Sequence, residues 1–238
     1  MRDPGAWASA DLRFDRDRGW EVRSEPPKPW TVDLDGLTFD LRPTDSGQVG
    51  IFPEQAANWR FVRDVVRPGH EVLNLFAYTG GATLAAVAAG SRVVHVDSSR
   101  PVVNWARRNA ELSGLDNRPI RWIVDDADAF VEREIRRGRL YDGIVLDPPT
   151  YGHGRGGAVW RLDDQLPAFL DACARLTRPD AFVILTAHAA DSDGHRLANE
   201  LSAAFGADRR VETEELVLTA TSGARLWLGS CARIMPGR

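Results

Sequence analysis

From position 71 onward the chain repeats one pattern, in which a short apolar run is followed by a longer stretch with helical character. Consecutive residues of a strand point to opposite faces, so short runs that are apolar at nearly every position predict strands buried on both faces of a parallel sheet. The predicted strands cover residues 71–76, 92–97, 120–124, 141–147 and 181–187. Parallel neighbours need crossover connections, so the stretches between them predict helices on both faces of the sheet. The predicted fold class is therefore α/β and Rossmann-like.

The C-terminal part of the chain departs from this repeat. Two β-rich segments, 211–220 and 225–235, are separated by a brief turn at Thr221, Ser222 and Gly223. So short a connection can join antiparallel strands only. We therefore expect a mostly parallel sheet that ends in an antiparallel hairpin. This arrangement differs from the all-parallel dinucleotide-binding fold and is typical of the class I methyltransferase variant of it.

The N-terminal part shows no helical periodicity, and Pro26, Pro27 and Pro29 would break a helix there. Apolar and polar residues alternate weakly over 30–41, with a turn signal at Asp35 and Gly36, which predicts a hairpin. We therefore expect a small β-rich appendage over residues 1–48 and a main domain over residues 49–238.

Composition limits the classes of protein. The hydrophobic share of 43% and the charged share of 27% are ordinary for a globular chain. The net charge of −4 argues against bulk electrostatic capture of nucleic acid. The two cysteines, Cys173 and Cys231, have no paired spacing, and no apolar run approaches membrane-spanning length. We expect a cytoplasmic protein with no metal and no membrane partner; composition leaves the oligomeric state open.

The first strand runs into the turn NLFAYTGG, Asn74 to Gly81, and then into a helix. Gly80 and Gly81 would let the backbone pass close to a ligand, and the helix N-terminus offers N–H donors. The G-x-G-x-x-G spacing of a dinucleotide site is absent, because Asn74 and Phe76 stand where small residues are needed. That counts against a nicotinamide-dependent oxidoreductase. S-adenosylmethionine has no pyrophosphate, so a looser turn suffices for it. The alternative is a plain strand-to-helix turn.

Two acidic positions follow the next strands. Asp97 ends the second strand, where a carboxylate can accept hydrogen bonds from both ribose hydroxyls. Asp125 and Asp126 follow the third strand, and we expect Asp126 to accept a bond from the adenine amino group. For both sites the alternative interpretation is a helix N-cap, a role that Ser98 or Ser99 could fill beside Asp97.

The fourth strand ends in LDPPTYG, residues 146–152. Ligands of open α/β sheets sit beyond the carboxyl ends of the strands, so this loop faces the predicted cofactor. Asp147 and the carbonyl of Pro148 are both acceptors, and Pro149 helps to fix them in one place. Two acceptors can hold a base amine with its lone pair aimed at a methyl group, while Tyr151 offers a face for stacking. The alternative is a rigid strand-exit turn.

These motifs together resemble the ribosomal RNA large-subunit methyltransferases, which make 5-methylcytosine, 2-methylguanine or 7-methylguanine. The similar blocks are residues 49–62, 74–86, 95–99, 104–115, 125–131, 146–152 and 226–235. The resemblance implies S-adenosyl-L-methionine as cofactor and RNA, ribosomal RNA in particular, as substrate. It places these residues at the cofactor: Phe52, Gln55, Asn74, Phe76, Ala77, Thr79, Gly80, Asp97, Ser98 and Asp126. It makes Asp147, Pro148, Pro149 and Tyr151 the catalytic set.

The chain departs from the cytosine branch of that family in three respects. Members of that branch carry an N-terminal PUA-type RNA-binding domain, and we expect residues 1–48 to be too short to form one. They also carry a catalytic cysteine at the end of the fifth strand, where this sequence reads Thr186, Ala187 and His188. Finally, the aromatic residue of the DPP motif falls at its fifth position instead of the commoner fourth. The missing cysteine favours a nitrogen over carbon 5 of cytosine as the methylated atom, while the shifted aromatic residue leaves the target atom open.

Further residues near the predicted site have weaker signals. His153 and His188 could act as bases, although a histidine in such a place is more often just a polar loop residue. Arg155 and Arg161 could bind phosphate, and a solvated loop explains them at least as well. Two other functions stay open. One is a methyltransferase with a small-molecule substrate, and the other is a non-catalytic module that binds RNA or a protein partner.

The missing thiol at the end of the fifth strand generates a prediction. Methylation of carbon 5 of cytosine needs covalent addition of a thiolate, whereas Cys173 and Cys231 lie elsewhere in the predicted fold. We expect the variant with both Cys173→Ser and Cys231→Ser to retain methyl transfer. Wild-type protein mixed with RNA containing 5-fluorocytosine should form no covalent adduct in denaturing gels, and an adduct mapped to either cysteine would refute this.

Overall fold

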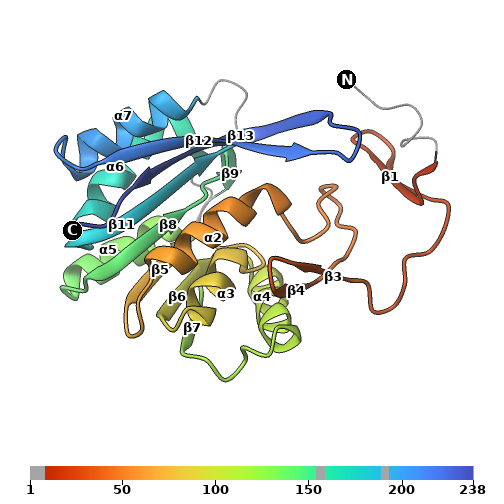
Figure 1. Cartoon of the computed structure of the whole chain (residues 1–238), viewed down its shortest axis with the longest axis horizontal. Coiled ribbons are helices and arrows are strands. Elements are labelled where there is room, and N and C mark those ends of the chain that lie inside the picture. The colour runs from red at the N-terminus through yellow and green to blue at the C-terminus, as the bar shows by residue number, and fades with distance from the viewer. Residues whose placement is uncertain (1–8, 154–158, 189–192, 238) are drawn as a thin grey trace.

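The computed structural model of the chain describes residues 9–153, 159–188 and 193–237, and the side chains of 153 and 159 are outside that description. A seven-stranded sheet runs through the molecule in the order β12-β13-β11-β8-β5-β6-β7 (Figure 1). Its strands are β5 (Glu71–Leu75), β6 (Arg92–Asp97), β7 (Ile120–Val124), β8 (Tyr141–Leu146), β11 (Thr177–Ala187), β12 (Val211–Thr219) and β13 (Arg225–Ile234).

Strand directions confirm the predicted fold class. Strands β11, β8, β5, β6 and β7 run parallel to one another. β13 pairs antiparallel with both β11 and β12. β11 begins at Thr177, four residues before the predicted position. Residues 178–180 at its start are exposed and polar, so they break the apolar pattern that the sequence prediction relied on.

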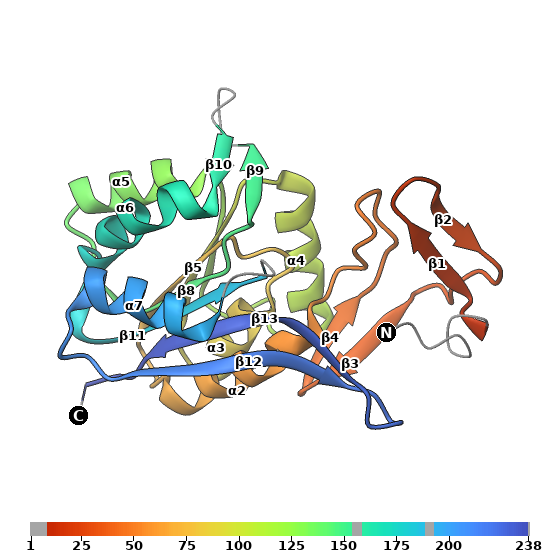
Figure 2. The same ribbon diagram turned by 90° about the horizontal axis from the view of Figure 1, so that it is seen from above.

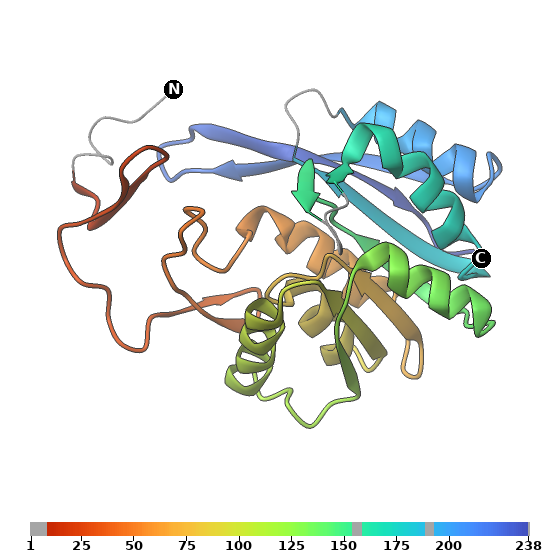
Figure 3. The same cartoon turned by 180° about the vertical axis from the view of Figure 1, so that it is seen from behind.

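Helices cover both faces of the sheet, as predicted (Figures 1 and 3). One layer contains α2 (Ala56–Val65), α3 (Gly81–Ala88) and α4 (Arg100–Leu112); the other contains α5 (Ala127–Arg136), α6 (Leu162–Ala174) and α7 (Gly194–Phe205). Within the described residues, none of the helices combines the length and apolar character needed to cross a bilayer.

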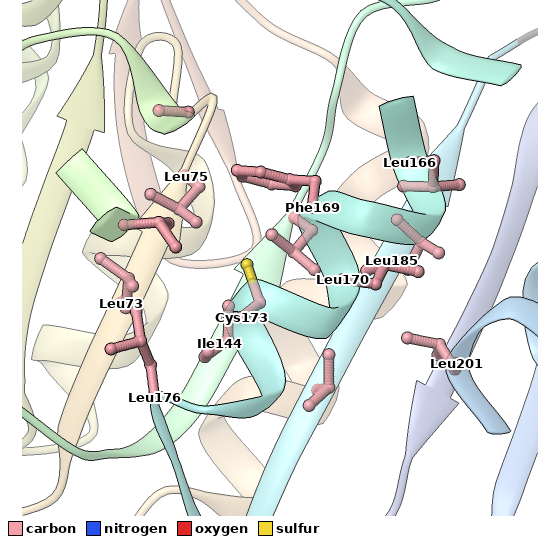
Figure 4. Packing of buried hydrophobic residues seen from close by; sticks show 14 of the residues in the cluster. Leu73, Leu75, Ile144, Leu166, Phe169, Leu170, Cys173, Leu176, Leu185 and Leu201 are labelled. Atoms are coloured by element: carbon pink, nitrogen blue, oxygen red, sulfur yellow. The ribbon is translucent and has the colours of Figure 1, made fainter. Parts of the chain in front are cut away.

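Alternate residues of each central strand belong to different hydrophobic cores. In β5, Leu73 and Leu75 pack with α5 and α6, whereas Val72 packs with α2 and α3. In β8, Ile144 faces the first core and Val145 the second. Figure 4 shows the first core around Cys173, Phe169 and Leu170 of α6. Burial on both sides explains why these strands read as continuous apolar runs.

Two hairpins precede the main sheet. The predicted one is β3 (Thr31–Leu34) with β4 (Leu37–Asp40), and its Phe39 is fully buried against the core of α2 and α3. The backbone of Asp40 also donates to Asn109 of α4 at 2.9 Å. The other hairpin, β1 (Leu12–Asp15) with β2 (Gly19–Val22), was not predicted. Figure 2 shows it beyond the body of the molecule.

Candidate functional site

The carboxyl ends of β5, β6, β7, β8 and β11 all lie at the same end of the sheet, because these strands are parallel. The predicted site residues from Asn74 to Pro149 lie in one of these strands or in the loop that follows it, and Tyr151 lies beyond the loop that follows β8. This end of the sheet is where open α/β sheets bind ligands.

The turn after β5 has an unusual backbone. Phe76 and Tyr78 have positive φ angles of 56° and 47°, and Gly80, at 93°, is also left-handed. Such conformations are costly for residues other than glycine, so the surrounding structure must hold them. Ala77 donates its N–H to the carbonyl of Val96 at 3.0 Å, which fixes the turn against β6.

Gly81, the first residue of α3, has a packing role. A Cβ atom at this position would lie 2.4 Å from Cζ2 of Trp59. Trp59 is buried and stacks on Phe39, with the ring centroids 5.2 Å apart. The second glycine of the turn therefore admits the indole of α2, and Gly80 is the one that needs glycine for its backbone conformation.

Asp97 joins the turn after β5 to the loop before α4. Its Oδ2 accepts the N–H of Tyr78 at 3.0 Å, and its Oδ1 accepts the N–H of Ser99 at 2.9 Å. A carboxylate offers about four acceptor positions, so one position stays open on each oxygen. Burial raises the pKa of Asp97, while the two backbone donors act in the opposite direction. Ser98 is exposed beside it.

Asp126 is the N-cap of α5. Its Oδ1 accepts the N–H of Ala129 at 3.1 Å, which is the alternative role considered from the sequence. The cap uses one oxygen, so capping and a bond to adenine are compatible. The neighbouring Asp125 forms an ion pair with Arg133 of the same helix.

A pocket that is partly open to solvent lies between this turn and the end of β8. It is lined by the predicted cofactor residues Phe52, Gln55, Asn74, Phe76, Ala77, Thr79 and Gly80, and also by Asp147 and Thr186. Asp97, Ser98 and Asp126 are outside this lining, at the ends of β6 and β7.

Asn74 also belongs to a buried polar chain. Its amide donates to Oγ1 of Thr83 at 2.9 Å, and that hydroxyl lies 2.9 Å from Nδ1 of His95. Burial lowers the pKa of His95 to about 3, and nearby Arg107 adds to the shift. His95 is therefore neutral, and these hydrogen-bonded side chains secure the start of α3 to the sheet.

Asp147 is held by three donors. Its Oδ1 accepts the hydroxyl of Thr186 at 2.5 Å and lies 3.1 Å from Nε2 of His188. Its Oδ2 accepts the amide N–H of Gln55 at 3.3 Å. Three of about four acceptor positions are thereby occupied. Among the described residues none occupies the remaining position, which is on Oδ2, the oxygen bonded to Gln55.

Both nitrogens of His188 face acceptors. Nδ1 lies 2.7 Å from the carbonyl of Leu228, the residue that bulges from β13, and Nε2 faces Asp147. Two acceptors favour the doubly protonated ring. Burial alone would lower the pKa of His188, but the bond to Asp147, its charge, the Leu228 carbonyl and Glu54 together raise it to about 9.

The η1 turn (Pro53–Gln55) and the residue before it complete the surroundings of His188. Oε1 of Glu54 lies 3.9 Å from Nδ1 of His188, and burial raises the pKa of Glu54. The ring of Phe52 is 5.8 Å from the imidazole and 5.2 Å from the ring of Tyr78. Phe52 therefore lies between the predicted cofactor turn and the residues around Asp147.

The DPP loop (Asp147, Pro148 and Pro149) is also held in place by Trp160. Pro148 is buried, and the indole N–H of Trp160 donates to the carbonyl of Pro149 at 2.7 Å. Trp160 packs on Phe76, with the ring centroids 5.4 Å apart. The indole therefore connects the loop to the turn after β5.

Tyr151 begins β9 (Tyr151–His153), opposite Arg161 of β10 (Val159–Arg161). It is 55% exposed, so its ring is accessible from solvent, but it does not line the pocket. The side chain of His153 and all of Arg155, two further candidates, lie outside the described residues.

Neither cysteine lines the pocket. Cys173 is fully buried in α6, and burial raises its pKa. Cys231 of β13 is paired with Thr186 and fully buried; burial raises its pKa to about 12. Among the residues that the structure describes, no three His, Cys, Asp or Glu side chains form a group suited to a metal ion.

Sequence reasoning missed the roles of Thr186, Glu54 and Trp160 and placed Gln55 at the cofactor alone. It considered His188 only as a base. A signal was available for Thr186 and His188, because residues at the end of β11 must lie beside the end of β8 once the two strands are paired. The bond from Trp160 to Pro149 spans two short strands that have no clear periodicity.

Comparison with known proteins supports the expected methyltransferase family over most of the chain. A family model described as S-adenosylmethionine-dependent methyltransferase matches residues 7–174. The structure is similar to a crystal structure of an S-adenosylmethionine-dependent methyltransferase from Agrobacterium tumefaciens, with 36% identity and a TM-score of 0.91. The match covers 100% of this chain and 80% of that one. A methyltransferase complexed with S-adenosylhomocysteine shares the fold, with a TM-score of 0.77 at 19% identity, over 91% and 58% of the two chains.

Curated relatives match over a shorter region. Ribosomal RNA large subunit methyltransferase I from Photobacterium profundum is 31% identical over 136 residues, which cover 57% of this chain and 34% of the relative. Ribosomal RNA large subunit methyltransferase K/L from Shewanella loihica is 30% identical over 158 residues, covering 63% and 21%. The chain thus spans about a third or less of the length of these relatives.

The open acceptor positions of Asp97 generate a prediction. If they receive two ribose hydroxyls, Asp97→Ala should weaken binding of S-adenosylmethionine by roughly 10- to 100-fold, since a charge-assisted hydrogen bond contributes about 1.5–3 kcal/mol. Asp97→Asn keeps one acceptor oxygen and should lose less. Isothermal titration calorimetry measures both, with thermal unfolding as a control for the loss of the bonds to Tyr78 and Ser99. Tight binding of NAD without binding of the methyl donor would contradict the assignment.

His188 generates a prediction about pH. Its folded-state pKa of about 9 lies above the ordinary 6.5, so its contribution to stability is complete below pH 6.5 and is lost as pH rises through 9. The difference in unfolding free energy between wild type and His188→Gln should therefore shrink from pH 6 to about pH 10. Urea denaturation across that range measures it. A difference that stays constant, or grows with pH, would show that the imidazole is neutral.

Proposed function

The chain belongs to the S-adenosylmethionine-dependent methyltransferase family, and on that premise we propose that it methylates a nitrogen of a nucleobase in RNA, most simply ribosomal RNA. The observation that carries the proposal is the hydrogen bonding of the Asp147 carboxylate. Thr186, His188 and Gln55 fix this carboxylate, and no other residue in the described part of the chain takes the second acceptor position of Oδ2. The adjoining carbonyl of Pro148 is a second acceptor on the same rigid loop.

The residues present fit the cofactor. Gly80 is left-handed and lines the pocket, while Asp97 keeps one acceptor position on each oxygen for the ribose hydroxyls. Asp126 is the candidate acceptor for the adenine amino group. When bound, S-adenosylmethionine supplies an electrophilic methyl group on a sulfonium and leaves as S-adenosylhomocysteine.

The chain contributes orientation. An amine nitrogen has a delocalised lone pair, and its N–H groups can be held by Oδ2 of Asp147 and the carbonyl of Pro148. That geometry aims the lone pair at the methyl carbon, and correct placement is itself a large part of catalysis. The nitrogen forms the new bond first and loses its proton afterwards. Asp147 is suited to receive that proton, whereas His188, with its pKa raised to about 9, already carries one at neutral pH.

Two observations favour RNA as the source of the base. The relatives from Photobacterium profundum and Shewanella loihica are named for ribosomal RNA. The ring of Tyr151, which is 55% exposed on the same loop, offers a stacking surface for a base turned out of its strand. The net charge of −4 favours the other candidate, a small-molecule substrate.

Substitutions at Asp147 and Tyr151 test the chemistry. Asp147→Ala should lower the single-turnover rate of methyl transfer by about 100-fold or more, because the nucleophile is no longer oriented, while cofactor affinity changes little. Tyr151→Ala should weaken RNA binding by about 1–3 kcal/mol. Tyr151→Phe is the matched control and should be mild, since stacking needs the ring alone. Wild-type turnover in Asp147→Ala would refute the assignment.

Mass spectrometry of nucleosides identifies the substrate. RNA from cells with and without the gene should differ in one N-methylated nucleoside, and purified protein with labelled S-adenosylmethionine should restore it in vitro. If RNA shows no difference while a metabolite becomes methylated, the RNA assignment fails and the chemistry of Asp147 remains open to test on that metabolite.

A further inference from the structure

A line of hydrogen-bonded side chains leads from β13 through α2 to Asp147. Nε of Arg233 donates to Oδ1 of Asn58 at 2.8 Å. Nδ2 of Asn58 donates to Oε1 of Gln55 at 2.7 Å, and Nε2 of Gln55 donates to Oδ2 of Asp147 at 3.3 Å. Cys231 adds a second contact, from Sγ to Oδ1 of Asn58 at 3.2 Å.

The two ends of this line have fixed hydrogen-bonding character. A guanidinium can only donate, and an ionised carboxylate can only accept. An amide between them can in principle point either way. Because Arg233 donates to Oδ1 of Asn58, its Nδ2 must face Gln55, which in turn directs the N–H group of Gln55 at Asp147. The guanidinium at one end and the carboxylate at the other thus require the same direction of both amides, and Nε2 of Gln55 also donates to Oγ1 of Thr186 at 3.4 Å.

Burial makes the direction strict. Asn58 is 1% exposed, so water cannot satisfy a reversed amide there, and Gln55, which lines the pocket, is 8% exposed. Reversal of Gln55 would place its carbonyl oxygen against the carboxylate of Asp147 in a region of low dielectric, which is strongly unfavourable. Arg233 is itself held in place, because it forms an ion pair with Glu214 and lies over the ring of Phe61 at 5.2 Å.

We propose that Asn58 is a positioning residue for methyl transfer, which acts through Gln55 to fix the orientation of Asp147. The donor from Gln55 occupies one position of Oδ2 and leaves the other to face the substrate. Asn58 reaches no reacting atom itself, since Gln55 lies between it and Asp147. This inference rests on the proposed role of Asp147 as the acceptor for the substrate nitrogen.

Asn58→Asp is the decisive variant, because it keeps the shape of the side chain and its bond to Arg233. The new carboxylate cannot donate to Gln55, so Gln55 lies between two carboxylates and its N–H group is no longer directed at Asp147 alone. We expect kcat to fall about 10-fold or more, with KM for S-adenosylmethionine within about twofold of wild type. Cys231→Ser is the matched control: it leaves Arg233 to direct Asn58, so both constants should stay unchanged.

A second readout does not depend on turnover. The charged groups that face His188 are Asp147 and Glu54, so loss of the Gln55 donor from Asp147 adds negative potential at the imidazole. The ¹⁵N NMR titration of His188 should therefore move to higher pH in Asn58→Asp and stay in place in Cys231→Ser. Because the new carboxylate itself adds negative charge, Asn58→Leu, which removes the donor to Gln55 without adding a charge, should move the titration in the same direction; a purely structural role for Asn58 would lower the stability of Asn58→Leu without this shift. Should Asn58→Asp fail to fold, Arg233→Met, which removes the directing donor, should give a smaller change in the same sense.

The two readouts separate this inference from the proposed function. If Asn58→Asp folds, binds the cofactor and keeps wild-type kcat and an unshifted His188 titration, the positioning role is overturned. If wild-type protein methylates no RNA, the proposed substrate fails, and the His188 titration still decides whether Asn58 controls the surroundings of Asp147.

Discussion

Burial of the central strands on both faces is the constraint on which the rest of the structure depends. Leu73 and Val72 of β5 point into different cores, and Ile144 and Val145 of β8 do the same. Strands packed in this way expose no face that could carry chemistry. Polar groups are therefore concentrated where the strands end, and Asp97, Asp147 and His188 all lie at those ends.

The same constraint explains how well the fold could be predicted. Runs buried on both faces are conspicuous in a sequence, and the observed β6 and β7 coincide with the predicted 92–97 and 120–124. Elements without that signal were missed or shortened. β1 and β2 depend on the contact between Phe14 and Trp20, whose rings are 5.2 Å apart, and neither strand has a hydrophobic face long enough to recognise.

The site was predictable where a role depends on position after a strand, and less so where it depends on pairing in space. The turn before Gly80 and the loop after Asp147 follow directly from local motifs. The role of His188 depends on the bulge that directs the carbonyl of Leu228 at its ring, and neither the register of β13 nor the bulge can be read from periodicity. Gln55 meets Asp147 across 92 positions of sequence, a contact that only the packing of η1 against the strand ends creates.

Because both thiols are completely buried, their reaction with an alkylating reagent would report local separation of a helical layer from the sheet. A thiol reacts as its thiolate, and burial disfavours that form at Cys173 and Cys231 alike. Cys173 lies between the sheet and α6, whereas Cys231 lies beneath α2 on the opposite face. Alkylation of one or the other would therefore distinguish which of the two helical layers separates from the sheet first.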